Sequence, residues 1–223
     1  MKEIEELRKI FEKNKNPEKA KQTEAYMKGL FCYLGIMQKP RTELSKNFIA
    51  WSLKQTNIED IVWTLWMEKE REFQYVAIEI LNKYCKKASK DFITFYEKLI
   101  VTKSWWDSVD MIAIKHIGTH LQRFPELIQE YSVKWIESDN MWLQRTAILF
   151  QNRYKENTDT ELLFSYIKRC SGDKEFFIRK AIGWALRDLS KSMPEKVQKF
   201  VEENELSGLS KREALKHIEK NKK

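Results

Sequence analysis

Residues 143–154 read Leu-Gln-Arg-Thr-Ala-Ile-Leu-Phe-Gln-Asn-Arg-Tyr, and residues 176–190 read Phe-Phe-Ile-Arg-Lys-Ala-Ile-Gly-Trp-Ala-Leu-Arg-Asp-Leu-Ser. In both stretches apolar residues recur at i, i+4, i+7 and i+11, a spacing that places them on one face of an α-helix. The apolar positions are Leu143, Ala147, Phe150 and Tyr154 in the first stretch and Ile178, Ile182, Ala185 and Leu189 in the second. Each stretch therefore predicts a core helix.

Both predicted helices contain an Ala-Ile pair, and two earlier segments contain the same pair. The pairs are Ala77-Ile78, Ala113-Ile114, Ala147-Ile148 and Ala181-Ile182, separated by 36, 34 and 34 residues. A unit of this length accommodates two helices and two turns, and a small Ala lets neighbouring helices approach closely. We predict an all-α fold, an α-solenoid of HEAT-like two-helix repeats (an α-α superhelix), with the Ala-Ile helices in one layer.

Other folds and frameworks fit the composition less well. The 34-residue spacing also suits tetratricopeptide repeats, but their Trp-x-x-Leu-Gly-x-x-Tyr pattern is absent. With 6 Gly and 4 Pro, the chain has too few turn residues for a fold of many short strands. Its 3 cysteines are far apart, which excludes a disulfide framework and predicts buried free thiols.

The 223 residues, 42% hydrophobic and 33% charged, predict one soluble domain over residues 1–223. No run is long enough for a membrane helix, and the acidic start does not resemble a secretory signal. The net charge of +8 makes an anionic partner plausible. About half of that excess lies in residues 211–223, so we expect a basic, mobile C-terminal end there and a mildly basic remainder.

Adjacent tryptophans open a predicted helix in the segment Lys103-Ser104-Trp105-Trp106-Asp107-Ser108-Val109-Asp110. Ser104 and Asp107 have the spacing of a capping box, as do Ser210 and Glu213 near the end of the chain. Asp110 follows Trp106 by four residues, so the two side chains share a helix face. A carboxylate beside an indole stabilises a cation, although Trp106 could equally be a core residue and Asp110 a partner of the helix dipole.

Two more candidates lie in the next two repeats, namely Arg145 and Trp184. At about 100° per residue, Trp184 lies within roughly 60° of the Ala direction of its own helix, as Trp106 and Asp110 do in theirs. Arg145 is rotated by about 160° from that direction. Helical spacing alone therefore does not bring all four residues together.

Several strings of the sequence resemble the AlkD family of bacterial DNA alkylation-repair glycosylases, from about residue 20 to about residue 190. They are Glu24-Ala25-Tyr26-Met27-Lys28, Leu34-Gly35-Ile36, Lys103 to Asp110, Ala147-Ile148-Leu149-Phe150-Gln151 and Phe176 to Trp184. The resemblance implies a HEAT-like solenoid, in agreement with the repeat. It does not explain the basic C-terminal end.

The resemblance also implies an activity. It implies a DNA glycosylase that hydrolyses the N-glycosidic bond of cationic alkylated purines, chiefly N3-methyladenine and N7-methylguanine, in duplex DNA for base excision repair. Members of the family work without a pocket for a flipped base. By the same resemblance we expect a location in a bacterial cytoplasm. A solenoid needs no partner to close it, so we expect a monomer, and we expect no cofactor.

The family's motifs assign roles to individual residues. Asp110 would stabilise the cationic sugar, Trp106 and Trp184 would flank it, and Arg145 would bind a nearby phosphate. Further contacts with the DNA backbone are expected from Tyr26, Lys28, Arg179 and Arg187, although a solvated surface role suits Arg179 and Arg187 as well.

Two other functions stay open. The chain could be a catalytically silent DNA-binding HEAT-repeat protein, or a HEAT-type protein-interaction scaffold whose tryptophans are anchors. The salt dependence of binding distinguishes these two functions, because binding to DNA phosphates weakens steeply as the salt concentration rises. His116 and His120 have the i, i+4 spacing of zinc ligands, but no Glu follows His116 and no third ligand is evident, so no metal is expected.

Overall fold

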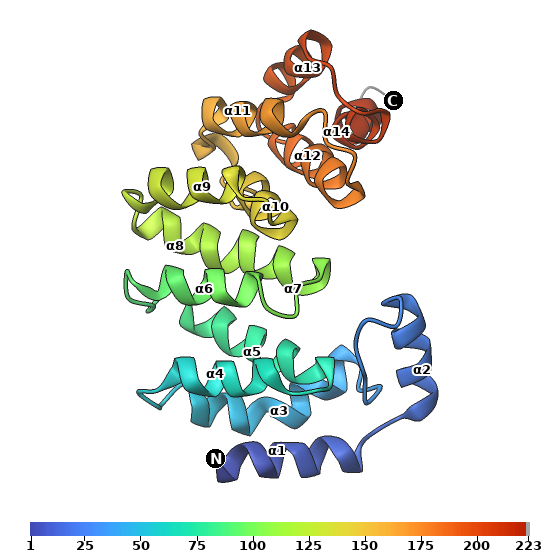
Figure 1. Ribbon diagram of the computed structural model, residues 1–223, viewed down its shortest axis with the longest axis vertical. Coiled ribbons are helices and arrows are strands. Elements are labelled where there is room, and N and C mark those ends of the chain that lie inside the picture. Colours follow the sequence, from blue (N-terminus) through green and yellow to red (C-terminus); the bar gives the residue numbers. More distant parts are fainter. Residues whose placement is uncertain (222–223) are drawn as a thin grey trace. The chain divides into compact units, whose positions relative to one another are not determined.

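Helices joined by short turns make up nearly all of the computed structural model, which describes residues 1–221 (Figure 1). No named strand occurs among these residues, and an isolated bridge joins Cys32 to Glu70. The chain divides into two compact units, Met1–Ala88 and Ser89–Lys223, which are described separately below. The expectation of one domain over residues 1–223 stays a prediction.

Unit 1 contains five helices. They are α1 (Lys2–Lys13), α2 (Pro17–Tyr26), α3 (Gln38–Ser52), α4 (Ile58–Met67) and α5 (Arg71–Tyr84). A loop follows α2, and its Gly35 has a φ of +80°, where a Cβ would lie 2.1 Å from the carbonyl oxygen of Asn16. The buried Glu72 carboxylate of α5 accepts hydrogen bonds from the backbone N–H groups of Leu34, Gly35 and Ile36. This carboxylate therefore fixes the path of the loop after α2.

Unit 2 contains the remaining helices. They are α6 (Phe92–Ile100), α7 (Trp106–Met111), η1 (Ile112–Ile117), α8 (Gly118–Arg123), α9 (Leu127–Glu137), α10 (Met141–Leu149), η2 (Lys155–Asn157), α11 (Thr160–Cys170), α12 (Phe176–Leu189), α13 (Pro194–Glu203) and α14 (Gly208–Asn221). The Ala-Ile pairs lie on α5 in unit 1 and on η1, α10 and α12 in unit 2, and all eight residues are buried. In unit 2, α10 packs against both η1 and α12. The Ala-Ile helices of this unit thus form one layer, as the repeat predicts.

The segments α7, η1 and α8 form one continuous helix over residues 106–123. Met111, Ile112, Ile117 and Gly118, the residues at the two junctions, all have right-handed helical backbone angles. The middle segment η1 is a π-helix, in which N–H groups bond to the carbonyl five residues back. Wide turns of this kind occur often at functional sites.

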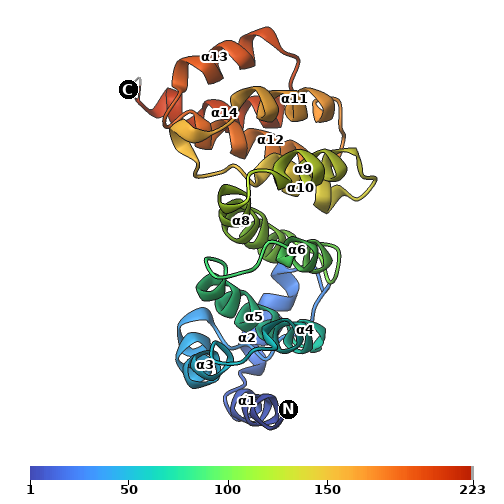
Figure 2. The ribbon, with the colours of Figure 1, turned by 90° about the vertical axis from the view of Figure 1, so that its left-hand side faces the viewer.

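The basic C-terminal end forms a helix that packs on α12. Figures 1 and 2 show α14 beside α12, and Ala214 and Ile218 of α14 are buried. Gly183 of α12 permits this approach, since a Cβ there would lie 2.5 Å from the Cβ of Glu213. Lys222 and Lys223, the last part of the expected mobile end, lie outside the described residues.

Three sequence expectations about local structure are wrong. Ser104 and Ser210 do not cap helices: the N-cap of α7 is Trp105, and α14 begins two residues before Ser210. The hydroxyl groups of these serines instead donate to the carbonyl oxygens of Ile100 and Arg179. The expectation of buried free thiols is confirmed for Cys85 and Cys170 but is wrong for Cys32, which is exposed in the loop after α2.

Candidate active site

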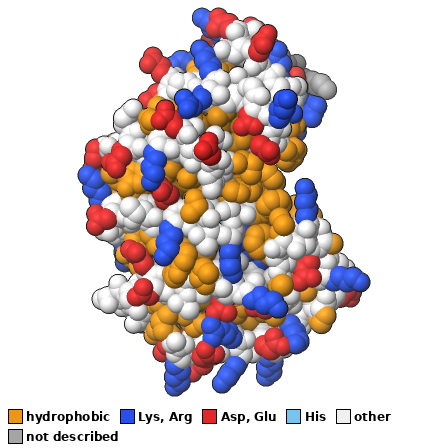
Figure 3. All heavy atoms as spheres, viewed as in Figure 1, with side chains coloured by type: hydrophobic (Ala, Val, Ile, Leu, Met, Phe, Trp, Pro, Cys, Tyr) orange, Lys and Arg blue, Asp and Glu red, His pale blue; other side chains and the backbone are white. Residues whose placement is uncertain are grey.

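A cavity of about 350 Å³ lies in unit 2 and brings together four helices. Its lining comes from α7, α10, α12 and α14, and Figure 3 shows hydrophobic side chains gathered over α10 and α12. The lining residues are Trp106, Asp110, Arg145, Phe176, Phe177, Lys180, Trp184, Arg187 and Glu213. The cavity thus collects all four residues that the sequence analysis assigned to catalysis.

Asp110 and Arg145 form a bidentate ion pair in this cavity. The Nε and Nη2 of Arg145 donate to the two carboxylate oxygens of Asp110, at 2.7 Å and 2.9 Å. A third donor, Nη1, hydrogen-bonds the carbonyl oxygen of Phe177. Three bonds in one plane fix the guanidinium, and the guanidinium in turn fixes the orientation of the carboxylate.

Burial and pairing act on the Asp110 carboxyl group in opposite directions. Its side chain is 13% exposed and that of Arg145 is 5% exposed. Burial raises the pKa of Asp110 above its ordinary value, and the hydrogen bonds and charge of Arg145 oppose that rise. Arg145 therefore favours the ionised form of a carboxyl group that the surrounding side chains would otherwise tend to neutralise.

The two adjacent tryptophans have different positions. Trp106 lines the cavity, whereas Trp105 packs its ring against Trp142 and Phe177, with centroid distances of 5.8 Å and 5.1 Å. Lys103, with a φ of +51°, is strained at the turn before them. Trp184 of α12 also lines the cavity and is partly exposed. The cavity therefore presents two indole rings beside the Asp110 carboxylate, and its lining also includes Glu213.

The expected backbone-binding residues are placed unequally. Arg187 lines the cavity, where its Nη1 donates to Glu213 at 2.8 Å, but Arg179 is not among the lining residues and its Nε donates to the carbonyl oxygen of Asp173. Tyr26 and Lys28 belong to unit 1, at the end of α2, where Tyr26 is 72% exposed and Lys28 has a φ of +59°. Their assignment to DNA stays a prediction.

Four of the lining residues, Phe176, Phe177, Lys180 and Glu213, have no role in the site predicted from the sequence. Phe176, Phe177 and Lys180 lie inside the string Phe176 to Trp184, which carries part of the family resemblance, and Lys180 precedes Trp184 by one helical turn. This i, i+4 spacing could have identified Lys180. Glu213 carries no comparable signal, because nothing in the sequence of the C-terminal end indicates which helix it packs against.

His116 and His120 lie away from this cavity. His116 is fully buried and stacks on the ring of Tyr96, and His120 bonds the carbonyl oxygen of Lys90 through Nε2. Among residues 1–221, no group of three or more His, Cys, Asp or Glu side chains could bind a metal ion. Within the same range, no helix combines the length and apolar character needed to span a bilayer.

Comparison with solved structures identifies similar folds. A predicted DNA alkylation repair enzyme from Enterococcus faecalis is 33% identical, with a TM-score of 0.86 over 92% of this chain and 96% of that one. AlkD2 from Streptococcus mutans is 16% identical, with a TM-score of 0.62 over 88% of this chain and 98% of that one. The protein smu.31 from Streptococcus mutans UA159 is also 16% identical, with a TM-score of 0.59 over 79% and 96%. These matches confirm the predicted all-α HEAT-like fold.

Sequence comparison extends the similarity to most of α14. No curated protein matches the chain. The model of the family described as DNA alkylation repair enzyme matches residues 7–218, a longer range than the strings quoted above, and confirms the resemblance that those strings indicated. The chain therefore belongs to the DNA alkylation repair enzyme family.

Proposed function

We propose that the protein is a DNA glycosylase that releases cationic alkylated purines, chiefly N3-methyladenine and N7-methylguanine, from duplex DNA. Membership of a DNA alkylation repair family implies that DNA is the substrate. The observation that carries the proposal is the Asp110 carboxylate, oriented by Arg145 in a cavity that two tryptophans also line. A fixed negative charge beside aromatic faces is complementary to a cationic sugar.

The chemistry requires little acid catalysis. When the glycosidic bond breaks, its electron pair goes to the alkylated base, which leaves as a neutral molecule because it was cationic. The deoxyribose is left as an oxocarbenium-like cation. Water then adds to C1′ and loses a proton, so that the abasic site is neutral at that carbon. Stabilisation of the sugar cation is therefore the main task of the site.

Asp110 performs this task by charge and by position. Its carboxylate stabilises the developing cation and accepts a hydrogen bond from the attacking water. Trp106 and Trp184 present ring faces to the sugar, which adds a cation–π contribution. Arg145 favours the ionised form of the carboxylate and aligns it, and its N–H groups that are not bonded to Asp110 or Phe177 are available to a backbone phosphate.

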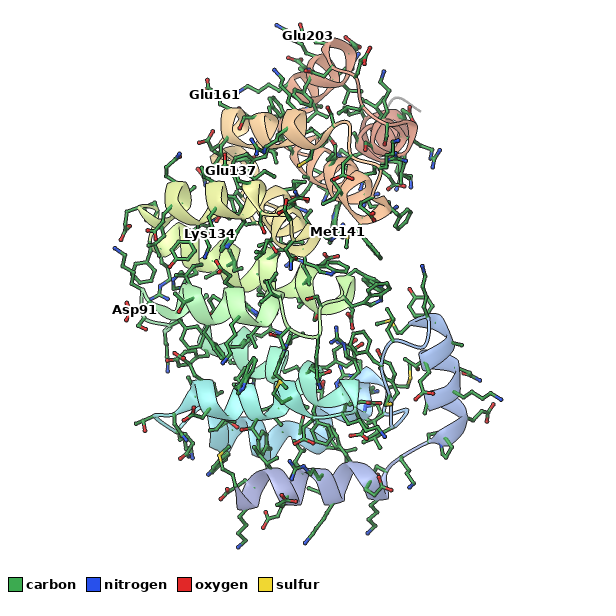
Figure 4. The ribbon with its side chains drawn as sticks, in the orientation of Figure 1. Asp91, Lys134, Glu137, Met141, Glu161 and Glu203 are labelled. Atoms are coloured by element: carbon green, nitrogen blue, oxygen red, sulfur yellow. The ribbon has the colours of Figure 1, made fainter. Side chains whose placement is uncertain are left out.

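The decisive experiment measures release of modified bases from alkylated duplex DNA in excess EDTA. Wild type should release N7-methylguanine and N3-methyladenine, and Asp110→Asn should lower the single-turnover rate about 100-fold to 1,000-fold. Asp91→Asn is the matched control, because Asp91 is exposed at the N-cap of α6, at the left edge of Figure 4. It should excise at the wild-type rate.

The same assay separates the other two functions. A folded wild-type protein that releases no base, yet binds DNA more weakly as salt rises, would be a DNA-binding protein without this activity. Neither release nor salt-dependent DNA binding would leave a protein-interaction scaffold. Activity that EDTA abolished and zinc or magnesium restored would contradict the metal-independent mechanism.

A further inference from the structure

Glu213 of α14 is buried where three cationic side chains converge. It is 5% exposed, and its carboxylate oxygens lie 3.2 Å from the Nζ of Lys180, 2.8 Å from the Nη1 of Arg187 and 2.6 Å from the Nζ of Lys216. These contacts hold the pKa of Glu213 at about 2, with the Lys216 hydrogen bond as the largest cause. The cluster therefore carries three positive charges and one negative charge at neutral pH.

Two of the three cations face the cavity that contains Asp110. Lys180 and Arg187, called the cation pair below, line that cavity together with Glu213. On α12 they precede and follow Trp184 by four and three residues, so all three side chains share one helix face. The cation pair thus flanks the indole ring that we assign to the sugar.

Both side chains of the cation pair have N–H donors that Glu213 does not occupy. The Lys180 side chain is 37% exposed and the Arg187 side chain is 32% exposed. An ammonium group has three N–H donors and a guanidinium group has five, and each spends only part of them on Glu213. Two like charges would normally separate, and the shared carboxylate keeps them together. The result is a pair of cationic donors held together at the cavity wall.

The packing of α14 explains why Glu213 can do this. A Cβ on Gly183 would lie 2.9 Å from the carbonyl oxygen of Ser210, so only glycine lets the two helices approach this closely. The Ser210 hydroxyl donates to the carbonyl oxygen of Arg179 at 3.0 Å, which fixes the register of α14 on α12. The backbone of the C-terminal helix is therefore set relative to the cation pair.

We infer that the cation pair, aligned by Glu213, is a binding site for one phosphodiester group of the DNA strand next to Trp184. This inference rests on the proposed function, and it makes α14 part of the active site. Lys180 and Arg187 bind the phosphate oxygens, and Glu213 is a positioning residue that does not touch DNA. A phosphate anchored on both sides of Trp184 keeps the deoxyribose of the lesion against the indole and the Asp110 carboxylate.

The test uses Glu213→Gln in the full chain and measures two quantities. Because one negative charge near the phosphate is lost, affinity for undamaged duplex should be equal to that of wild type or higher. Because the cation pair is no longer aligned, the single-turnover excision rate should fall about tenfold to a hundredfold. Binding and excision that change in opposite directions would not result from a general loss of structure.

Glu219→Gln is the matched control, since it makes the same charge change on the exposed surface of α14 and beside a different cavity. It should excise at the wild-type rate. Glu213→Asp keeps the negative charge on a side chain that is one methylene shorter. This variant should excise faster than Glu213→Gln. Excision by Glu213→Gln at the wild-type rate, or a loss of binding parallel to the loss of excision, would overturn the inference.

A second measurement keeps the inference separate from the proposed function. Lys180→Ala and Arg187→Ala should each lower the slope of log affinity against log salt by up to about 0.9, as expected for a phosphate contact. This result does not depend on base release. If wild type released no base but these slopes fell, the phosphate site would stand and the glycosylase assignment would fail. Unchanged slopes in both variants would overturn the phosphate site.

Discussion

Arg145 donates two parallel hydrogen bonds to Asp110 across 35 residues of sequence, and both side chains line one cavity. The contact joins α10 to α7, two helices of neighbouring repeats. It is the geometry of a guanidinium fork on a carboxylate, which an ammonium group cannot reproduce. Arg145 therefore orients the Asp110 carboxylate and also places a positive charge beside it.

Arg145→Lys tests the orientation directly. The charge remains, but the fork and the bond to the Phe177 carbonyl are lost, so the single-turnover excision rate should fall by about tenfold or more. Arg169→Lys is the matched control, because Arg169 makes a 3.7 Å pair with Glu137 on the exposed surface. Equal excision rates for wild type and Arg145→Lys would show that charge alone suffices.

The pH dependence of excision should report the ionisation of Asp110. Burial raises the pKa of this carboxyl group and Arg145 opposes the rise, and the carboxylate is the active form. The rate should therefore fall as pH falls through that raised pKa. In Arg145→Met the opposing charge is gone, so the fall should begin at a higher pH than in wild type. Rates corrected for spontaneous depurination, measured from pH 8 downward, give both profiles, and coincident profiles would contradict this account.

His116 should make the fold sensitive to acid. Burial lowers the pKa of His116 to about 3, whereas an unfolded histidine titrates near 6.5. Between these values the unfolded chain binds a proton that the native protein does not, so the free energy of unfolding falls as pH falls below about 6.5. The loss from this group should reach about 2 kcal/mol at pH 5.

His116→Phe should remove that contribution, since phenylalanine keeps a ring to stack on Tyr96. Urea unfolding at pH 7 and pH 5 gives the comparison. The variant should lose less stability than wild type between the two pH values, although His120, whose pKa burial also lowers, adds its own dependence. An equal loss in both proteins would assign the acid sensitivity elsewhere.

Gly183→Ala should separate α14 from α12. The added methyl group would lie 2.5 Å from the Cβ of Glu213, so α14 must move. We expect a loss of about 1 to 3 kcal/mol in the free energy of unfolding and a fall in excision. Gly172→Ala is the control, because a Cβ there has no neighbour within 4 Å. Thermal unfolding and single-turnover excision measure both effects, and unchanged values for Gly183→Ala would contradict the close approach.

The repeat was readable from the sequence because it is local. All eight residues of the Ala-Ile pairs are buried, and each pair lies within one helical segment, so the same two residues recur at nearly constant spacing. The position of Arg145 was not readable in this way. On a regular helix Arg145 lies about 160° from the direction of Ala147. Its guanidinium nevertheless reaches Asp110, because the side chain is long and α7 lies beside α10.

Glu213 shows a second limit of sequence reasoning. Charge counting treated the C-terminal end as a basic, mobile segment, because Lys and Arg outnumber Glu there. The structure instead uses the acidic minority: Glu213 packs beside Gly183 and pairs with cations of α12. A contact between two helices cannot be derived from the composition of one of them.

The π-helical turn over Ile112–Ile117 sets the angular phase between the two ends of its helix. One additional residue in a turn rotates every later side chain by about 100° relative to a regular α-helix. With this offset Asp110 lies at the cavity while His116 and His120 lie in the interior. Deleting any single residue of this turn would leave the composition almost unchanged. It would nevertheless rotate either Asp110 away from the cavity or the two histidines away from the interior. The length of this segment is thus as much a determinant of the site as the carboxylate itself.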